Sequence, residues 1–377
     1  MQLIRHRPPR RRPCAASAFV LLAAALQGLS GCHDPIERVG AIWPIGSIVV
    51  QDCSGDGTDD VLAYHLTGES GAPMRSLDAL SGTDGSLLWR VENVDPGEYC
   101  YAPQATDVGD SNGDGKSDFA VSVMGQVSVL SGADGASLFA IDDAWGRSHS
   151  GRVDVDGDGH PDVIVGERLY GEGASQFGRV CLVSGATGIV LWSSLGSAGE
   201  RIGLAVAGVR VQGAVLVVTL ARRDSGGLEL IIFDAAGRRF RTISLDVGVK
   251  GAHLLSLESD EVGVPDELVV LADDGRIYDL DSSLVLNLAG VAAAIGNVCG
   301  AAQWADETGG VGRQLAVIGT ERCHVLDLST GRRIEAFNGG VGGVVRDRDR
   351  DVTIGNLIFD GNGVRLVSSS GVIWQKY

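Results

Sequence analysis

The residues best suited to chemistry in this chain of 377 residues are carboxylates that alternate along one short stretch. Between positions 154 and 162 the sequence reads DVDGDGHPD, with acids at its first, third, fifth and ninth positions. These carboxylates and the backbone carbonyl of the seventh residue could point into one small volume. Such an all-oxygen, anionic cage suits a hard divalent cation such as Ca²⁺. Glycines at the fourth and sixth positions permit backbone angles that a side chain would forbid.

The same pattern occurs three times, and each copy opens an apolar stretch typical of a strand. The predicted ligands of the first copy are Asp52, Ser54, Asp56, Thr58 and Asp60. Those of the second copy are Asp110, Asn112, Asp114, Lys116 and Asp118. Those of the third copy are Asp154, Asp156, Asp158, His160 and Asp162. The seventh residue of each loop contributes only its carbonyl, so the side chains of Lys116 and His160 do not exclude their loops. The sequence therefore predicts about three calcium sites.

Other metal sites fit the pattern less well. An EF-hand needs flanking helices and a bidentate glutamate at position 12, where this chain has Ala63, Val121 and Val165. A zinc or two-metal catalytic centre would need ligands gathered in one place, whereas these loops form separate cages. Three degenerate acidic stretches, 258–266, 306–310 and 347–351, leave cation binding open.

A turn signature sets the period of the chain. Stretches similar to Ser-Gly-x-x-Gly end in glycines at positions 85, 135, 188, 237, 331 and 371. With a degenerate copy near 281–283, the mean step is about 48 residues and the copies number seven. Each unit reads strand, acidic loop, strand, loop, strand, turn, strand. Four short antiparallel strands per unit are typical of a propeller blade.

The predicted fold is therefore all-β, a seven-bladed β-propeller of four-stranded antiparallel blades over residues 44–377, with six or eight blades left open. Residues 36–44 are a candidate ring-closing strand that would pair with the last blade. The aromatic residue after each turn is predicted to lie on the outer strand and pack against the next blade. These aromatic residues are Trp89, Phe139, Trp192, Phe240 and Trp374.

The N-terminal segment has the pattern of a secretory signal. Five arginines and no acid occupy residues 1–12, and an apolar run of about 15 residues follows. The run ends in Leu29-Ser30-Gly31-Cys32, which resembles the bacterial lipobox. That resemblance implies a lipoprotein signal over 1–31, diacylation of Cys32, a tether over 32–43 and a lipid-anchored place in the bacterial cell envelope. An ordinary signal peptide is the alternative.

Charge and cysteine content restrict the partners. Removing the signal lowers the basic count from 31 to 26 against 48 acids, a net charge of −22. This balance disfavours nucleic acid and anionic membrane surfaces as partners. Five cysteines would remain besides Cys32, and an odd number leaves at least one thiol without an intramolecular partner. Cys299 and Cys323 are the candidate disulfide, with two buried thiols as the alternative.

The acidic loops followed by apolar strands resemble the FG-GAP/VCBS repeats of integrin-α-type propellers. The repeat pattern extends over roughly 44–377, although intact loops occur only at 52–60, 110–118 and 154–162. The resemblance implies calcium on one face of the propeller and a partner on the opposite face.

Three classes of function fit these features. The first is a calcium-stabilised interaction or adhesion module that binds a protein or a glycan. The second is a propeller enzyme, either a polysaccharide lyase or a quinoprotein, since the turns also resemble the tryptophan-docking turns of quinoprotein dehydrogenases. The third is a scaffold subunit of an envelope assembly. The sequence contains no nucleophile elbow and no phosphate-binding glycine loop, so the prediction is a protein that is not an enzyme.

Overall fold

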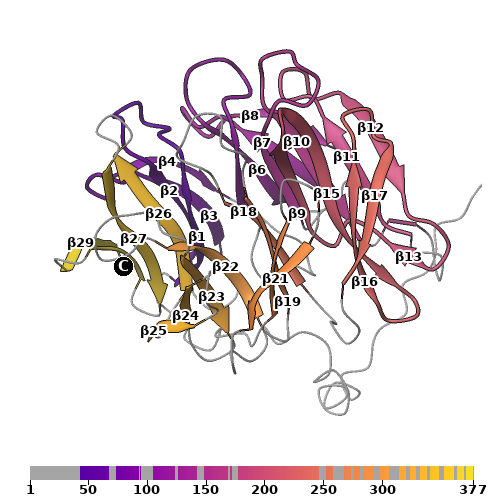
Figure 1. Ribbon diagram of the computed structural model, residues 1–377. Coiled ribbons are helices and arrows are strands. Elements are labelled where there is room, and N and C mark those ends of the chain that lie inside the picture. Colours follow the sequence, from indigo (N-terminus) through magenta and orange to yellow (C-terminus); the bar gives the residue numbers. More distant parts are fainter. Residues whose placement is uncertain are drawn as a thin grey trace, which may run out of the picture. The chain divides into compact units, whose positions relative to one another are not determined.

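The computed structural model describes most of the chain from residue 43 onwards (Figure 1). The described ranges are 43–67, 74–92, 94, 105–123, 126–141, 148–168, 170–171, 177–245, 252–257, 267–272, 276–280, 284, 286–291, 298–304, 314–319, 323–327, 332–337, 340–347, 352–360, 363–368 and 371–376. All regular elements in these ranges are β-strands, which confirms the predicted all-β class. No helix among these residues is long and apolar enough to span a membrane.

The strands that flank the three acidic loops form three antiparallel sheets. The first sheet consists of β1 (Trp43–Val50), β2 (Asp60–Thr67), β3 (Met74–Leu80) and β4 (Leu87–Glu92). The second consists of β5 (Ala105–Gly109), β6 (Asp118–Val123), β7 (Gln126–Leu130) and β8 (Ser137–Ile141). The third consists of β9 (Ser148–Val153), β10 (Asp162–Glu167), β11 (Arg179–Val183) and β12 (Val190–Leu195).

Four further sheets follow along the chain. The fourth contains β13 (Glu200–Arg201), β14 (Val206–Val211), β15 (Ala214–Arg223), β16 (Leu228–Phe233) and β17 (Arg239–Ser244). The fifth contains β18 (Ala252–Leu257), β19 (Glu267–Ala272), β20 (Arg276–Leu280) and β21 (Leu286–Val291). The sixth contains β22 (Val298–Trp304), β23 (Gln314–Gly319), β24 (Cys323–Asp327) and β25 (Arg333–Phe337). The seventh contains β26 (Gly340–Asp347), β27 (Val352–Asp360), β28 (Gly363–Ser368) and β29 (Gly371–Lys376).

The predicted repeat unit is confirmed in the first three sheets. In each of them, consecutive strands pair antiparallel in chain order, the acidic loop joins the first two strands, and the glycine turn joins the last two. The fourth sheet differs because the long strand β15 pairs with both β14 and the short β13. Its first hairpin turns at Gln212 and Gly213, without an acidic loop.

The hydrophobic core lies between successive sheets. One cluster joins Leu62 and Leu77 of the first sheet to Phe119 of the second. Further clusters join the second sheet to the third, the third to the fourth, and the fourth to the fifth. Every residue of β10 is buried, because both faces of this strand are covered. A strand covered on both faces has a continuous apolar run instead of an alternating pattern, as Val163, Ile164 and Val165 illustrate.

The first strands of the sheets lie beside one another in chain order. Each first strand contacts the first strand of the next sheet, with β14 taking this place in the fourth sheet, and β26 of the seventh sheet contacts β1 of the first. A core cluster also joins Val61 and Leu80 of the first sheet to Leu357, Leu366 and Trp374 of the seventh. The two ends of the described chain therefore pack together.

Aromatic side chains on the last strands anchor one sheet to the next. The Trp89 indole donates a hydrogen bond to the carbonyl of Gly132 in the following turn, at 2.7 Å. Trp192 donates likewise to Ala235 at 3.1 Å, and Trp374 to Gly82 at 2.9 Å. These turns need glycine, because a Cβ at Gly135 would lie 2.8 Å from the Trp89 ring. Packing of the aromatic residue on the next sheet is confirmed at these positions, and Phe139 packs on Gly188 in the same way.

Phe240 is the exception, and its predicted role is wrong. Its side chain is 63% exposed. The turn before β17 closes with a bond from Asp234 to Arg238, whereas the first turn closes from Ser81 to Ser86 and is one residue longer. Strand pairing therefore places Arg241 where Trp89 and Trp192 lie in their sheets. Phe240 follows its turn glycine Gly237 by three residues, whereas Trp89 and Trp192 follow theirs by four, so Phe240 falls between the two paired positions and is left in solvent.

Several predictions fall outside the described residues. The signal and tether, Cys32, and most of the degenerate acidic stretches belong to this group. Of the candidate closing strand, the structure describes Trp43 and Pro44, which pair with Leu66 and His65 of their own sheet. Cys53, Cys181 and Cys323 are buried, whereas the side chain of Cys299 is not described, so its pairing with Cys323 stays a prediction.

Candidate calcium-binding loops

The three acidic loops share one backbone conformation. Each begins at the end of the first strand of its sheet and ends at the first residue of the second strand. The glycines at the fourth and sixth positions all have positive φ angles, between 78° and 91°. These glycines are Gly55, Gly57, Gly113, Gly115, Gly157 and Gly159. A side chain at these positions would strain the backbone, so the predicted role of the glycines is confirmed.

The first-position aspartate closes each loop around itself. In the third loop, the two carboxylate oxygens of Asp154 accept hydrogen bonds from the backbone N–H groups of Gly157 at 2.7 Å and Gly159 at 3.0 Å. Asp52 and Asp110 accept the equivalent bonds in their loops. The tight turn therefore depends on one carboxylate that neutralises the amide dipoles at the glycines.

The third and fifth positions continue this pattern. Asp156 accepts a hydrogen bond from the backbone of Asp158 at 3.1 Å, and Asp158 accepts one from His160 at 2.8 Å. The same bonds occur in the second loop, to Asn112 from Asp114 and to Asp114 from Lys116. In the first loop, Asp56 accepts from Thr58, whereas the Ser54 hydroxyl donates to Asp52. In each loop, hydrogen bonds from the loop's own backbone therefore fix the orientation of these side-chain oxygens.

The ninth-position aspartate joins each loop to the glycine turn of the same sheet. Asp162 is fully buried, and one of its oxygens accepts from the amides of Val155 at 2.9 Å and Asp156 at 3.3 Å. Its other oxygen accepts from the amide of Gly185 at 3.2 Å. Asp60 and Asp118 make the same three bonds, the last of them with Gly82 and Gly132. One carboxylate therefore holds two separate segments of the sheet.

Burial changes the acidity of these carboxylates. Burial raises the pKa of Asp118 to about 6, and the three backbone hydrogen bonds offset only part of this effect. Burial also raises the pKa of Asp60 and of Asp162. A nearby cation would favour the charged form of each group and so lower its pKa.

The third loop gathers three carboxylates into a candidate metal site. One oxygen from each of Asp154, Asp156 and Asp162 lies within 4.8 Å of the others. Carboxylate oxygens at this spacing are the donors that Ca²⁺ prefers. The carboxylate of Asp158, predicted as a fourth ligand, is exposed and does not belong to this group. In the first two loops the third position is Ser54 or Asn112, so fewer carboxylates are available there.

The three loops are neighbours in space. The His160 ring lies over Gly113 of the second loop, where a Cβ would come within 3.2 Å of the ring. Lys116 extends similarly toward Gly55 of the first loop, where a Cβ would lie 4.0 Å from its Cε atom. The side chain at the seventh position, to which we assigned no role, therefore packs against the preceding loop.

Sequence reasoning missed the glycines that receive the loops. A Cβ at Gly132 would lie 1.8 Å from the carbonyl oxygen of Ser117, and one at Gly185 would lie 1.8 Å from that of Pro161. The sequence shows the Ser-Gly pair that opens each turn as a repeat, which predicts a hairpin but does not indicate that the glycine contacts the acidic loop. Asp107 was also missed. Its carboxylate accepts hydrogen bonds from the backbone N–H of Gln51 at 2.6 Å and from the Ser117 hydroxyl at 3.1 Å. These bonds link the first two sheets beside the loops.

Comparisons with known proteins support the fold. The sequence matches no protein-family model and no curated protein. A chain of the crystal structure of BBS1N in complex with ARL6DN is 11% identical, with a TM-score of 0.48, and the match covers 90% of this chain and 93% of that one. Raptor of Chaetomium thermophilum is 12% identical, with a TM-score of 0.51, over 81% of this chain and 26% of that one. At 12% identity the similarity to Raptor shows the fold alone, an all-β fold of β-propeller type.

Proposed function

We propose that this protein is a calcium-stabilised interaction module, anchored in a bacterial cell envelope, that binds a protein or glycan partner. The observation that carries the calcium part is the convergence of Asp154, Asp156 and Asp162 in one loop. Two further loops with the same backbone conformation lie beside it. The interaction part follows from the fold class, since propellers present broad rigid surfaces, and from the large apolar side chains exposed on the last strands.

The residues present fit a calcium ion. Asp154, Asp156 and Asp162 would hold it in the third loop, and Asp52, Asp56 and Asp60 or Asp110, Asp114 and Asp118 in the other two. When bound, calcium would supply the positive charge that offsets the repulsion among these carboxylates. The ninth-position aspartate would then transmit this stabilisation to the glycine turn, because it holds both segments. In this proposal calcium stabilises the sheet and takes no part in catalysis.

We further propose that the seven sheets close into a seven-bladed ring over residues 44–377. Support comes from the contact between β26 and β1 and from the hydrogen bond between Trp374 and Gly82. The blades would be variants of FG-GAP/VCBS repeats. A ring of six or eight blades would need a different partition of the same strands.

The anchor and location rest on the sequence. We propose that residues 1–31 are a lipoprotein signal, that Cys32 carries the lipid, and that residues 32–43 tether the propeller to the membrane. Two acyl chains on one residue give stable anchoring. Labelling cells with a radioactive fatty acid tests this, since a Cys32→Ser variant should lose the label and leave the membrane fraction.

We infer that the protein is not an enzyme. His149, a buried histidine on β9, has one ring nitrogen 2.8 Å from the Thr106 hydroxyl and the other 3.1 Å from the Ser122 hydroxyl. Both nitrogens thus have hydrogen-bond partners in the interior, which suits a structural role.

Thermal unfolding of the purified protein with excess calcium or with EDTA tests the calcium proposal. A ligand that binds only the folded state stabilises it by about 2.7 kcal/mol per site at a hundredfold excess over its Kd. Calcium should therefore raise Tm, and an Asp154→Asn/Asp156→Asn variant should lose much of that rise. Asp134→Asn, an exposed acid in a turn, is the matched control. An equal Tm in calcium and EDTA would refute calcium binding.

A partner search tests the interaction proposal separately. Glycan arrays and affinity capture from envelope extracts, each with and without calcium, should return a specific partner whose binding weakens in EDTA. Turnover of a polysaccharide or of an alcohol with added quinone cofactor would instead establish an enzyme.

A further inference from the structure

Two neighbouring edge strands expose an unusual number of large apolar side chains. On β12 and in the turn before it, Ile189, Val190, Leu191 and Leu195 are exposed, and Phe240 is exposed on β17. Leu195 and Phe240 leave 53% and 63% of their surface in solvent. A contiguous exposed apolar surface usually marks an interaction site.

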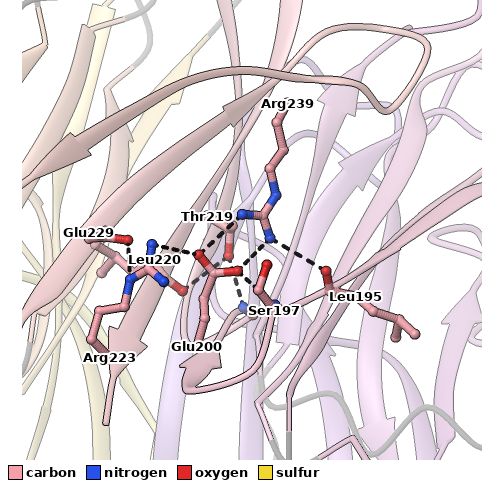
Figure 2. A network of polar contacts seen from close by, with 9 residues as sticks. Leu195, Ser197, Glu200, Thr219, Leu220, Arg223, Glu229 and Arg239 are labelled. Carbon is pink, nitrogen blue, oxygen red and sulfur yellow. Dashed lines mark hydrogen bonds and ion pairs between the residues drawn. The ribbon is translucent and has the colours of Figure 1, made fainter. Parts of the chain in front are cut away.

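Direct contacts hold these two strands side by side. Trp192 of β12 donates its indole hydrogen bond to Ala235, in the turn that leads into β17. Arg239 of β17 donates to the carbonyl oxygen of Leu195 at 3.4 Å (Figure 2). The end of β12 therefore lies beside the start of β17, and we name the surface that the exposed residues of these two strands form the β12/β17 edge.

A buried carboxylate fixes this edge (Figure 2). Glu200 is fully buried, and both its oxygens accept hydrogen bonds from the Arg239 guanidinium, at 3.1 and 2.6 Å. Arg223 forms an ion pair with Glu200 at 3.3 Å and donates to Glu229 at 2.8 Å. Burial alone would raise the pKa of Glu200, but the bonds from Arg239 and the amide of Ser197 hold it below its ordinary value. The carboxylate thus stays charged and holds β17 in place.

The edge is basic in a strongly acidic protein. Arg238 and Arg241 lie on either side of Phe240 and are exposed, and Arg239 is paired with Glu200, whereas the chain has a net charge of −17. Local charge of this sign attracts an anionic partner. It also disfavours pairing between the β17 strands of two copies, because like charges on facing strands repel.

Both strands lie at the outer end of their sheets. Among the described strands, β17 pairs only with β16, and β12 only with β11. An edge strand offers backbone N–H and C=O groups to an added strand. A lipid surface would satisfy the arginines and Phe240 but would leave those backbone groups without protein partners. The geometry therefore favours a peptide over a membrane.

We propose that the β12/β17 edge binds an extended acidic peptide segment that alternates acids with apolar residues and adds to β17 as a further strand. Its acids would pair with Arg238 and Arg241, its apolar side chains would pack on Phe240 and Leu195, and its backbone would pair with β17. This inference rests on the proposed function as an interaction module and names the partner chemistry and the surface.

Calorimetry with a synthetic peptide of alternating glutamate and valine tests the proposal directly. Arg238→Glu/Arg241→Glu and Phe240→Ser should each weaken its binding by about tenfold or more, since charged and aromatic contacts dominate such interfaces. Ile334→Ser is the matched control, because Ile334 is 52% exposed on β25 at the corresponding register position. That variant should bind as the parent protein does. Circular dichroism and Tm verify that every variant is folded.

Two further probes separate strand addition from charge alone. The same peptide with N-methyl groups on alternate residues should not bind, because it cannot donate to the edge strand. A lysine and valine peptide should not bind either. The proposal is overturned if the glutamate peptide does not bind, if the N-methylated or lysine peptide binds equally well, or if the protein sediments with anionic phospholipid vesicles while the glutamate peptide fails to bind.

The same measurements in EDTA keep this proposal apart from the calcium proposal. The β12/β17 edge belongs to the third and fourth sheets and involves none of the predicted calcium ligands. Loss of peptide binding in folded edge variants that keep their calcium-dependent Tm supports the edge. A calcium-independent Tm with intact peptide binding would refute calcium and leave the edge standing.

Discussion

Asp162 accepts three backbone hydrogen bonds with a single carboxylate, so its removal leaves one buried and two partly buried N–H groups without partners. Asp158, four positions earlier, is exposed and accepts only one bond from His160. The two residues were predicted from the sequence as equivalent ligands. In the structure they differ in burial and in what each of them holds.

Replacement of these two aspartates should therefore have different effects without calcium. We expect Asp162→Ala to lower the free energy of unfolding by about 3 kcal/mol or more, because buried unsatisfied donors each cost about 1–3 kcal/mol. Asp158→Ala should lower it by less than about 1 kcal/mol. Urea unfolding in EDTA measures both values. Equal losses would mean that the ninth position does not join the loop to its turn.

Asp118 predicts a dependence of stability on pH. Its pKa is about 6 in the folded state without a cation, against 3.8 for the ordinary group, so the folded state binds the proton more tightly. This contribution to stability is complete below about pH 4 and is lost as the pH rises through 6, a change of roughly 3 kcal/mol. Asp118→Asn, measured in EDTA between pH 4 and 7, should flatten that decline. An unchanged slope would contradict the raised pKa.

At the scale of the element, an aromatic side chain on the last strand of the first, second, third and seventh sheets packs on the turn of a neighbouring sheet. Trp89 is nearly buried against the next turn, whereas Phe240 is exposed because it follows its turn glycine by three residues instead of four. The repeat predicted the strands, the acidic loops and the glycine turns. It did not predict the register within β17, because Phe240 follows Gly237 by three residues where Trp89 follows Gly85 by four, and this spacing decides which side chain faces the next sheet.

This difference predicts a contrast between two aromatic substitutions. Trp89→Ala should cost about 3–5 kcal/mol of unfolding free energy through the lost packing and the cavity it leaves. Phe240→Ala should change it by less than about 0.5 kcal/mol, as is usual for exposed positions. Chemical denaturation compares the two. A large loss at Phe240 would mean that its side chain is covered in solution.

For the whole molecule, the contact between its first and seventh sheets is the decisive feature. Trp374 donates to Gly82 as Trp89 donates to Gly132, so the junction between the chain ends has the same chemistry as an internal junction. The sequence favoured seven copies but placed the closure in residues 36–44. Of that segment only Trp43 and Pro44 are described, and they pair within their own sheet. In the described residues the two ends meet by packing and by the Trp374 indole, one of the aromatic residues predicted to pack on a neighbouring blade.

If the ring is closed, Trp374→Ala should destabilise the protein about as much as Trp89→Ala, by about 3–5 kcal/mol. The loss should also raise amide hydrogen exchange in both the first and the seventh sheets, since each covers the other. Exchange that increases only in the last sheet would mean that the ends do not depend on each other.

The double attachment of the ninth-position aspartate has a practical consequence for protein engineering. In the fourth sheet, Ala235 occupies the place of the turn glycine, and the first hairpin has only Gln212 and Gly213 where the first three sheets have eight or nine residues. A Cβ at the equivalent Gly132 or Gly185 would collide with the loop carbonyl. An acidic loop that is grafted alone into the fourth sheet would therefore not fit. The transplantable unit is the loop together with its Ser-Gly turn, two segments that are separate in the sequence but must be exchanged as one part.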